Sequence, residues 1–157
     1  VTVLAIPFTR NYILNALQLG NGESSESGGI SCINYGSASN YATIEDFVKN
    51  NNFNFSYPRG LSEKYQINKI ICVNESNTVF LFFKDKNISY EIWLDNTDIS
   101  SYTSDASVYH FGNHTTYIVN DEVDSDTYYS YTVIGNDIHS ITSSDMNDIE
   151  TIINSIE

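Results

Sequence analysis

The chain has 157 residues and a formal net charge of −13, because 20 Asp and Glu outnumber 7 Lys and Arg. All the basic residues lie between Arg10 and Lys86, whereas residues 91–157 carry thirteen acids and no Lys or Arg. A nucleic-acid-binding protein needs a basic face that displaces phosphate counterions, and the second half of this chain has none. Docking to anionic lipid by charge is excluded for the same reason, so any membrane attachment is expected through an anchor outside this chain.

Length and composition predict a single globular domain over residues 1–157. The sequence is 41% apolar and 13% aromatic, which excludes a disordered tail, and no run of apolar residues is long enough to cross a bilayer. The chain starts at Val1 without a Met or a signal-peptide pattern, which indicates a piece processed or trimmed from a longer protein. Its first residues are then either the outer end of a removed membrane helix or a core segment. Cys32 and Cys72 permit one disulfide, but two unrelated buried side chains fit the same count.

The N-terminal part predicts one or two helices. Residues 7–19 have a proline in the expected first turn and a narrow apolar stripe, which favours a helix that could be juxtamembrane. Residues 20–40 are rich in Gly and Ser and predict a loop. A sheet-and-helix core is expected over 41–157, beginning with a short helix that Thr43 caps.

From Phe53 onward the apolar pattern changes to a period of two, which indicates strands. The clearest alternation is in 88–95, where the even positions are apolar, and Glu91 and Trp93 fall on the other side, expected to be solvated. The short turn signals between the apolar runs favour hairpins. Six strands are predicted, at 65–74, 79–84, 88–95, 107–112, 115–121 and 127–135.

The C-terminal segment predicts an amphipathic helix. Thr142 and Asp145 have the spacing of a capping box, and Ile141 and Met146 lie where a hydrophobic staple would. The apolar stripe comprises Met146, Ile149, Ile152, Ile153 and Ile156, and the opposite, polar side comprises Asp148, Glu150 and Asn154. Strands in unbroken succession with helices at the ends predict an α+β fold: a twisted antiparallel sheet of five or six strands with this helix packed on one face.

Two groups of residues are candidate metal ligands. Asp121, Glu122, Asp124 and Asp126 form an acidic loop whose oxygens could hold Ca²⁺ weakly, although the order of an EF-hand loop is absent and a solvated turn is the simpler interpretation. His110 and His114 have an H-x3-H spacing, but Gly112 and Asn113 between them predict a turn and not the helix that zinc sites of this spacing use.

A group of aromatic residues is the candidate ligand-binding surface. Trp93, Tyr117, Tyr129 and Tyr131 could line a groove for a sugar or a peptide, whereas packing across the sheet is the alternative. The motifs of P-loop, Rossmann and nucleophile-elbow enzymes are absent, so no catalytic residue and no cofactor is predicted.

The order of these segments resembles domain-of-unknown-function family 4367. The segment FSYPRGLSEKYQI is similar to that family's P-x-x-L-P-x-G-Y motif, and the strand pair in INKIICVNESNTVFLFFKDKNISYEIWL follows it. The closing YTVIGNDI and ITSSDMNDIETIINSIE are similar to the family's final strand and helix. The resemblance covers about residues 53–157 and implies an extracytoplasmic domain of a Gram-positive membrane protein or lipoprotein of the anti-sigma-factor type, with a membrane anchor before Val1.

The predicted function is therefore a non-enzymatic extracytoplasmic sensor or interaction domain of a membrane-anchored, anti-sigma-like regulator. Its partner would be a protein or a small-molecule signal and not a nucleic acid. A secreted ligand-binding or carbohydrate-binding domain, or a hydrolase with an acidic cleft, is the alternative, and a structural spacer is a third.

Overall fold

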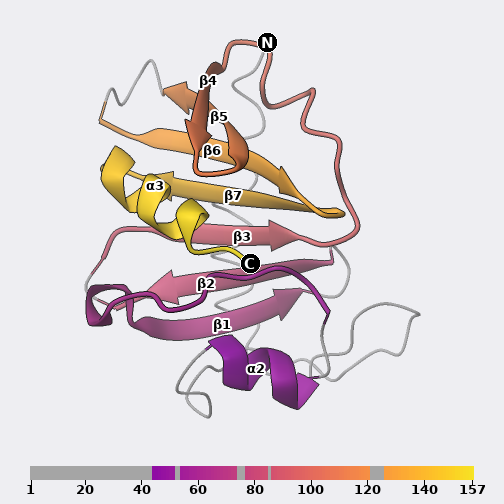
Figure 1. Ribbon diagram of the computed structural model, residues 1–157, viewed down its shortest axis with the longest axis vertical. Helices are drawn as coiled ribbons and strands as arrows, with labels where there is room; N and C mark the ends of the chain where they lie inside the picture. Colours follow the sequence, from indigo (N-terminus) through magenta and orange to yellow (C-terminus); the bar gives the residue numbers. More distant parts are fainter. Residues whose placement is uncertain (1–43, 52–53, 74–76, 85, 121–125) are drawn as a thin grey trace.

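Seven antiparallel strands form one sheet in the computed structural model, which describes residues 44–51, 54–73, 77–84, 86–120 and 126–157. The strands lie in the order β1-β2-β3-β7-β6-β5-β4 (Figure 1). Their bounds are β1 Ile67–Val73, β2 Thr78–Phe83, β3 Ser89–Trp93, β4 Ser107–Phe111, β5 His114–Asn120, β6 Tyr128–Ile134 and β7 Asp137–Ser143. Two consecutive runs of hairpin-connected strands, β1–β3 and β4–β7, are thus joined side by side where β3 pairs with β7.

A long connection over 94–106 links the two runs, because β4 lies at the opposite edge of the sheet from β1. Asp95 begins this connection with a φ of 54°, a left-handed conformation that few side chains adopt. Its backbone N–H donates to Oδ1 of Asp137 on β7 at 2.9 Å. This bond holds the start of the connection against the central strands.

The predicted antiparallel sheet with a C-terminal helix is confirmed, but the expected five or six strands are wrong, since the sheet has seven. The strand that the sequence did not reveal is β7. It lies in the middle of the sheet and is buried on both faces, so Ile138 and Ile141, three positions apart, face opposite sides of it. The remaining positions hold small or polar side chains, and the pattern therefore lacks the alternation by which half-buried strands are found.

Helix α3 (Met146–Asn154) covers one face of the sheet (Figure 1). Ile149, Ile152 and Ile153 are fully buried there, which confirms the predicted stripe. The N-cap is Asp145, whose side chain accepts from the N–H of Asn147, whereas Thr142 belongs to β7, so the capping box expected between these two residues is wrong. The cap satisfies one of the four unpaired N–H groups at the start of the helix.

The prediction that Asp148 lies on the polar, outward side of the helix is also wrong, because this residue is buried. Its Oδ1 accepts from Lys86 Nζ at 2.6 Å and from the Tyr65 hydroxyl at 2.8 Å. The two bonds favour the charged carboxylate and lower the pKa of Asp148 despite its burial, and the same contact raises the pKa of Lys86. This group attaches α3 to the β2–β3 connection and to the short helix η2 (Glu63–Tyr65).

Helix α2 (Ile44–Asn51) confirms the short helix predicted after Thr43, and it packs Ile44, Phe47 and Val48 into the core. The segment after it runs beside the end of the chain, where Pro58 forms a β-bridge with Ile156 and the Arg59 N–H donates to the Ser155 carbonyl at 2.7 Å. The predictions for the helix at 7–19, the loop at 20–40, the Thr43 cap and Cys32 lie outside the described residues. Within the described part of the chain, no helix is both long and apolar enough to cross a membrane.

Candidate functional site

The face of the sheet opposite α3 carries a row of side chains that runs across the strands. In the strand register Glu91 of β3 is opposite Ser140 of β7, Ser140 is opposite Tyr131 of β6, and Tyr131 is opposite Tyr117 of β5. Residues directly opposite one another share a face, so these four side chains lie in one row. The row faces away from α3, because Tyr90, next to Glu91, is in the core cluster that includes the helix.

Three aromatic rings gather on this face, and we call Trp93, Tyr102 and Tyr131 the aromatic cluster. The ring centroids of Trp93 and Tyr102 are 5.1 Å apart, those of Tyr102 and Tyr131 5.3 Å, and those of Trp93 and Tyr131 6.0 Å. Tyr102 comes from the 94–106 connection, whereas the other two come from the sheet. All three residues are half-buried, so the cluster both packs the connection onto the sheet and offers aromatic surface to solvent.

Glu91 is a buried acid beside this cluster. The residue is only 7% exposed, and its Oε2 accepts from the indole Nε1–H of Trp93 at 2.9 Å. Burial raises the pKa of Glu91 to about 7, although the hydrogen bond from Trp93 lowers it in part. The described residues place no Lys, Arg or His in an ion pair with this carboxyl group. The expectation that Glu91 lies on a solvated side is therefore wrong, because the opposite face is also covered at this central strand.

Tyr131 is affected by the same surroundings. Burial and then the negative charge of Glu91 raise the pKa of Tyr131 well above its ordinary value. Its hydroxyl therefore stays protonated at neutral pH and can donate a hydrogen bond. The site thus combines aromatic faces with a hydroxyl donor and a carboxyl group that is only part-ionised near pH 7.

The structure brings some of the predicted aromatic residues together and leaves others apart. Trp93 and Tyr131 are in contact, and Tyr117 lies next to Tyr131 across the strands. Tyr129 shares the face but is two positions along β6, opposite Val119. Tyr102 was not predicted, because its connection has no periodic pattern that would place it.

The predicted acidic calcium loop stays a prediction. Asp121, Glu122 and Asp124 lie outside the described residues, and Asp126 is exposed. Elsewhere in the described residues no group of three or more His, Cys, Asp or Glu side chains is placed to hold a metal ion.

The two histidines with H-x3-H spacing point to opposite faces. His110 is opposite Thr115 in the β4–β5 hairpin, and the next pair in the register is Phe111 with His114. Successive pairs alternate between the faces of a sheet, so His110 and His114 cannot converge on one metal ion in this conformation.

His139 is a further buried titratable group, which the sequence did not indicate. Its Nδ1 is 2.6 Å from the Tyr90 hydroxyl, and its Nε2 is buried with no hydrogen-bond partner in the described structure. Burial, and to a lesser extent His114, lowers the pKa of His139 to about 3, so the ring is neutral. The ring lies on the α3 face beside Ile92, without access to solvent, and we assign it a packing role.

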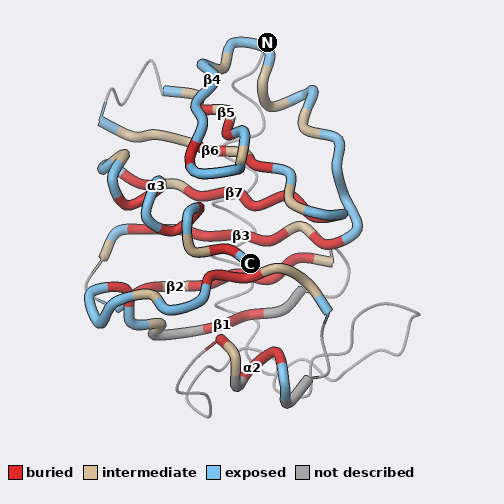
Figure 2. The backbone as a smooth tube through the Cα atoms, in the orientation of Figure 1, coloured by how far each residue is buried: buried red, intermediate tan, exposed pale blue. Residues whose placement is uncertain are grey.

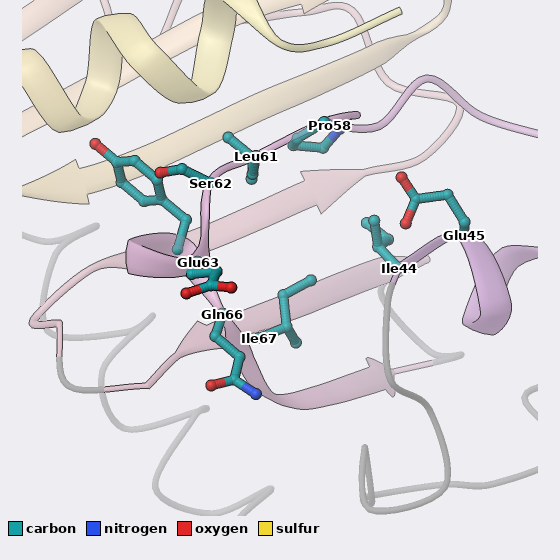
Figure 3. A pocket seen from close by; sticks show the side chains of 10 residues that line it. Ile44, Glu45, Pro58, Leu61, Ser62, Glu63, Gln66 and Ile67 are labelled. Carbon is teal, nitrogen blue, oxygen red and sulfur yellow. The ribbon is translucent and has the colours of Figure 1, made fainter.

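A hollow lies elsewhere, between α2 and the segment before β1 (Figure 3). It has a volume of about 900 Å³, and its walls combine apolar side chains such as Ile44 and Leu61 with the carboxylates of Glu45 and Glu63. Glu63 and Gln66 come from the same short segment, and Glu45 from the helix across the hollow (Figure 3). The hollow is at the β1 end of the sheet, far in the strand order from the aromatic cluster, and Glu91 does not line it.

The chain was compared with known proteins at three levels. No protein-family model, no curated protein and no solved structure matches it. The resemblance to domain-of-unknown-function family 4367 therefore stays a prediction from the quoted motifs.

Proposed function

We propose that this chain is a non-enzymatic recognition domain that binds its ligand on the face of the sheet opposite α3. The observation that carries the proposal is the aromatic cluster next to the buried carboxyl group of Glu91. Partly exposed aromatic rings with adjacent hydrogen-bonding groups are the usual composition of a surface that recognises sugars or peptides. On the other face, α3 packs the fully buried Ile149, Ile152 and Ile153 against the sheet.

The chemistry of the cluster suits a neutral ligand with several hydroxyl or amide groups. The Tyr131 hydroxyl can donate, and the part-ionised carboxyl group of Glu91 can donate or accept. The rings supply flat apolar area at a small cost in side-chain entropy. Because Glu91, Trp93 and Tyr131 are held by strands of one sheet, a ligand would find them already in place.

We also propose that the domain serves as the extracytoplasmic sensor or interaction part of a membrane-anchored regulator. The resemblance of the quoted motifs to those of family 4367 supports this setting, and the lack of basic residues after Lys86 argues against a nucleic-acid partner.

A carbohydrate-binding domain or a hydrolase is the second candidate, and Glu91 is the observation that favours it. A buried carboxyl group beside an indole ring, with a pKa near neutrality, is the kind of group that can act as a general acid. A hydrolase of this type needs a second carboxylate on the far side of the scissile bond. The two candidates differ in whether a bound oligosaccharide is cleaved.

Fluorescence provides the test, because Trp93 is the single tryptophan of the chain and belongs to the cluster. We expect soluble cell-wall oligosaccharides or short peptides to change the emission of Trp93 on titration. Tyr131→Ala should weaken the binding at least about tenfold, as expected for a central aromatic contact. Tyr109→Ala is the matched control, because this exposed tyrosine pairs with Thr116 and faces the other side of the sheet.

The proposal fails if a ligand binds with unchanged Trp93 emission and with equal affinity for the Tyr131→Ala variant. Release of reducing sugar from an oligosaccharide by the wild-type chain, lost in Glu91→Gln, would instead establish the hydrolase.

A further inference from the structure

Strand β4 is an edge strand with little to prevent another strand from pairing with it. It is last in the strand order, and Ser107, Val108, Tyr109 and His110 are all exposed (Figure 2). Val108 is 55% exposed on one face and Tyr109 is 41% exposed on the other. The side chains next to the outer edge of β4 are therefore exposed to solvent on both faces of the sheet.

The register shows which backbone groups of β4 point outward. A two-residue turn joins Phe111 to His114, and such a turn is closed by a hydrogen-bonded pair. Hydrogen-bonded and non-hydrogen-bonded pairs then alternate along an antiparallel ladder, so Tyr109 bonds to β5 whereas Val108 and His110 do not. The N–H and C=O groups of Val108 and His110 thus face away from the sheet, and no described residue bonds to them.

The opposite edge of the sheet has an irregularity that β4 lacks. The register of strand β1 shifts between Ile67 and Lys69, which breaks the regular edge. An irregularity on an edge strand is a common means of preventing pairing with another chain. Strand β4 keeps an unbroken register over all five residues.

We propose that β4 is a docking edge at which an extended segment with cationic side chains adds as a further antiparallel strand. The backbone groups of Val108 and His110 would supply the hydrogen bonds, as in other cases of strand addition. The side chains of the added strand on one face would lie next to Val108, at the end of the row that continues through Tyr117 and Tyr131. The inference rests on the proposed role as a recognition domain, but it uses a different surface from the aromatic cluster.

The net negative charge around β4 indicates which kind of partner would bind to this edge. Residues 91–157 contain thirteen acids and no Lys or Arg, and exposed Asp105 lies two positions before β4. A cationic segment would be attracted to this half of the molecule, whereas a second copy would bring the same acidic half against it. Complementary charge therefore favours a basic peptide segment over self-association.

The test uses a nine-residue, acetylated and amidated peptide in which Lys and Val alternate. We expect it to shift the backbone amide resonances of Val108 and His110 in NMR spectra and to slow their hydrogen exchange. Val108→Pro removes one outward N–H without removing a bond to β5, and should weaken binding about tenfold, the loss of one hydrogen bond. Val108→Thr keeps the N–H and the β-branched shape, so it should bind within about twofold of wild type.

Two further binding measurements test the proposal even if the Val108→Pro variant does not fold. Replacing Lys by Glu in the peptide should weaken binding to the wild-type chain at least about tenfold at low salt. Val108→Lys keeps the backbone donor but adds a positive charge at the edge, so it should weaken binding of the Lys peptide and narrow its advantage over the Glu peptide.

The inference is overturned if the shifted amides lie outside β4, if a folded Val108→Pro variant binds as well as wild type, or if both peptides bind equally. Self-association of the chain that Val108→Pro abolishes would also overturn it, in favour of a second copy. Tyr131→Ala should leave peptide binding within about twofold. Failure at β4 with intact binding at Trp93, or the reverse, then shows which of the two proposals is wrong.

Discussion

The two edges of the sheet have opposite surroundings, although each is an antiparallel strand that pairs with one neighbour. In β1 the consecutive residues Ile70 and Ile71 are both buried, so that strand is covered on both faces. In β4 the consecutive residues Val108 and Tyr109 are both exposed. The β1–β3 part of the sheet therefore contributes mainly to stability, and the outer strands of the β4–β7 part present surface for contacts.

The largest expected difference between the two edges is in stability. Ile70→Ala should lower the free energy of unfolding by about 2–5 kcal/mol, because it leaves a cavity in the core. Val108→Ala should change it by less than about 0.5 kcal/mol, because the side chain is already in water. Urea unfolding of both variants measures the difference. Equal losses would show that β4 is covered in solution.

The buried carboxyl group of Glu91 makes the centre of the sheet sensitive to pH. Its pKa is about 7 in the folded chain and ordinary in the unfolded chain, so the folded state binds the proton more tightly. Stability should therefore fall as the pH rises from about 4.5 to 7 and stay constant above that range. Glu91→Gln should remove this dependence and stabilise the chain by up to about 3 kcal/mol at about pH 8.

Chemical unfolding of both chains at several pH values checks this effect. The fluorescence of Trp93, whose indole donates to Glu91, should titrate with the same midpoint in wild type and not in Glu91→Gln. A midpoint near the ordinary pKa of a glutamate would contradict the burial of this group.

Asp148 has the opposite pH dependence, because its folded pKa is lowered by Lys86 and Tyr65. Its contribution to stability is present above the ordinary aspartate pKa and is lost as the pH falls through the lowered value. Asp148→Asn should cost about 1.5–3 kcal/mol near neutral pH, as for hydrogen bonds to a charged group. Glu150→Gln is the control, since Glu150 is exposed on the same helix. Thermal unfolding measures both, and equal effects would mean that α3 is not attached through Lys86.

The sequence predicted those elements whose apolar residues form a regular pattern or an unbroken run. Ile149, Ile152 and Ile153 lie on one side of α3, and the even positions of 88–95 lie on one side of β3, so the period of the apolar residues identified both. The central strand β7 could not be detected in this way, because neighbours cover both of its faces and the polar Ser140 is buried alongside Ile141. Periodicity records which side of an element faces water, and for a strand with no such side it carries no information.

The candidate site was predictable only in part for a related reason. Trp93 and Tyr131 could be suspected from their residue type, but their contact depends on the β3–β7–β6 pairing, in which the undetected strand lies between them. We expected Glu91 to face solvent, because charged side chains are usually exposed. Glu91 lies between Phe80 of β2 and Ser140 of β7 in the register, and this pairing is not visible within the segment 88–95.

The smallest expected effect concerns the hairpin that carries the β4 edge. Gly112 begins its turn with a φ of 58°, and a Cβ at this position would lie 2.8 Å from Oδ1 of Asn154. Gly112→Ala should cost about 1–2 kcal/mol, mainly because alanine is strained in this conformation, whereas the exposed Asn154 side chain can move away. Gly60→Ala is the matched control, since it has a φ of 64° with nothing near its Cβ position. If β4 is held only by its pairing with β5, the Gly112 variant should also speed the hydrogen exchange of Tyr109, and the Gly60 variant should not. Unchanged exchange in the Gly112 variant would mean that β4 is held in place by contacts beyond this hairpin.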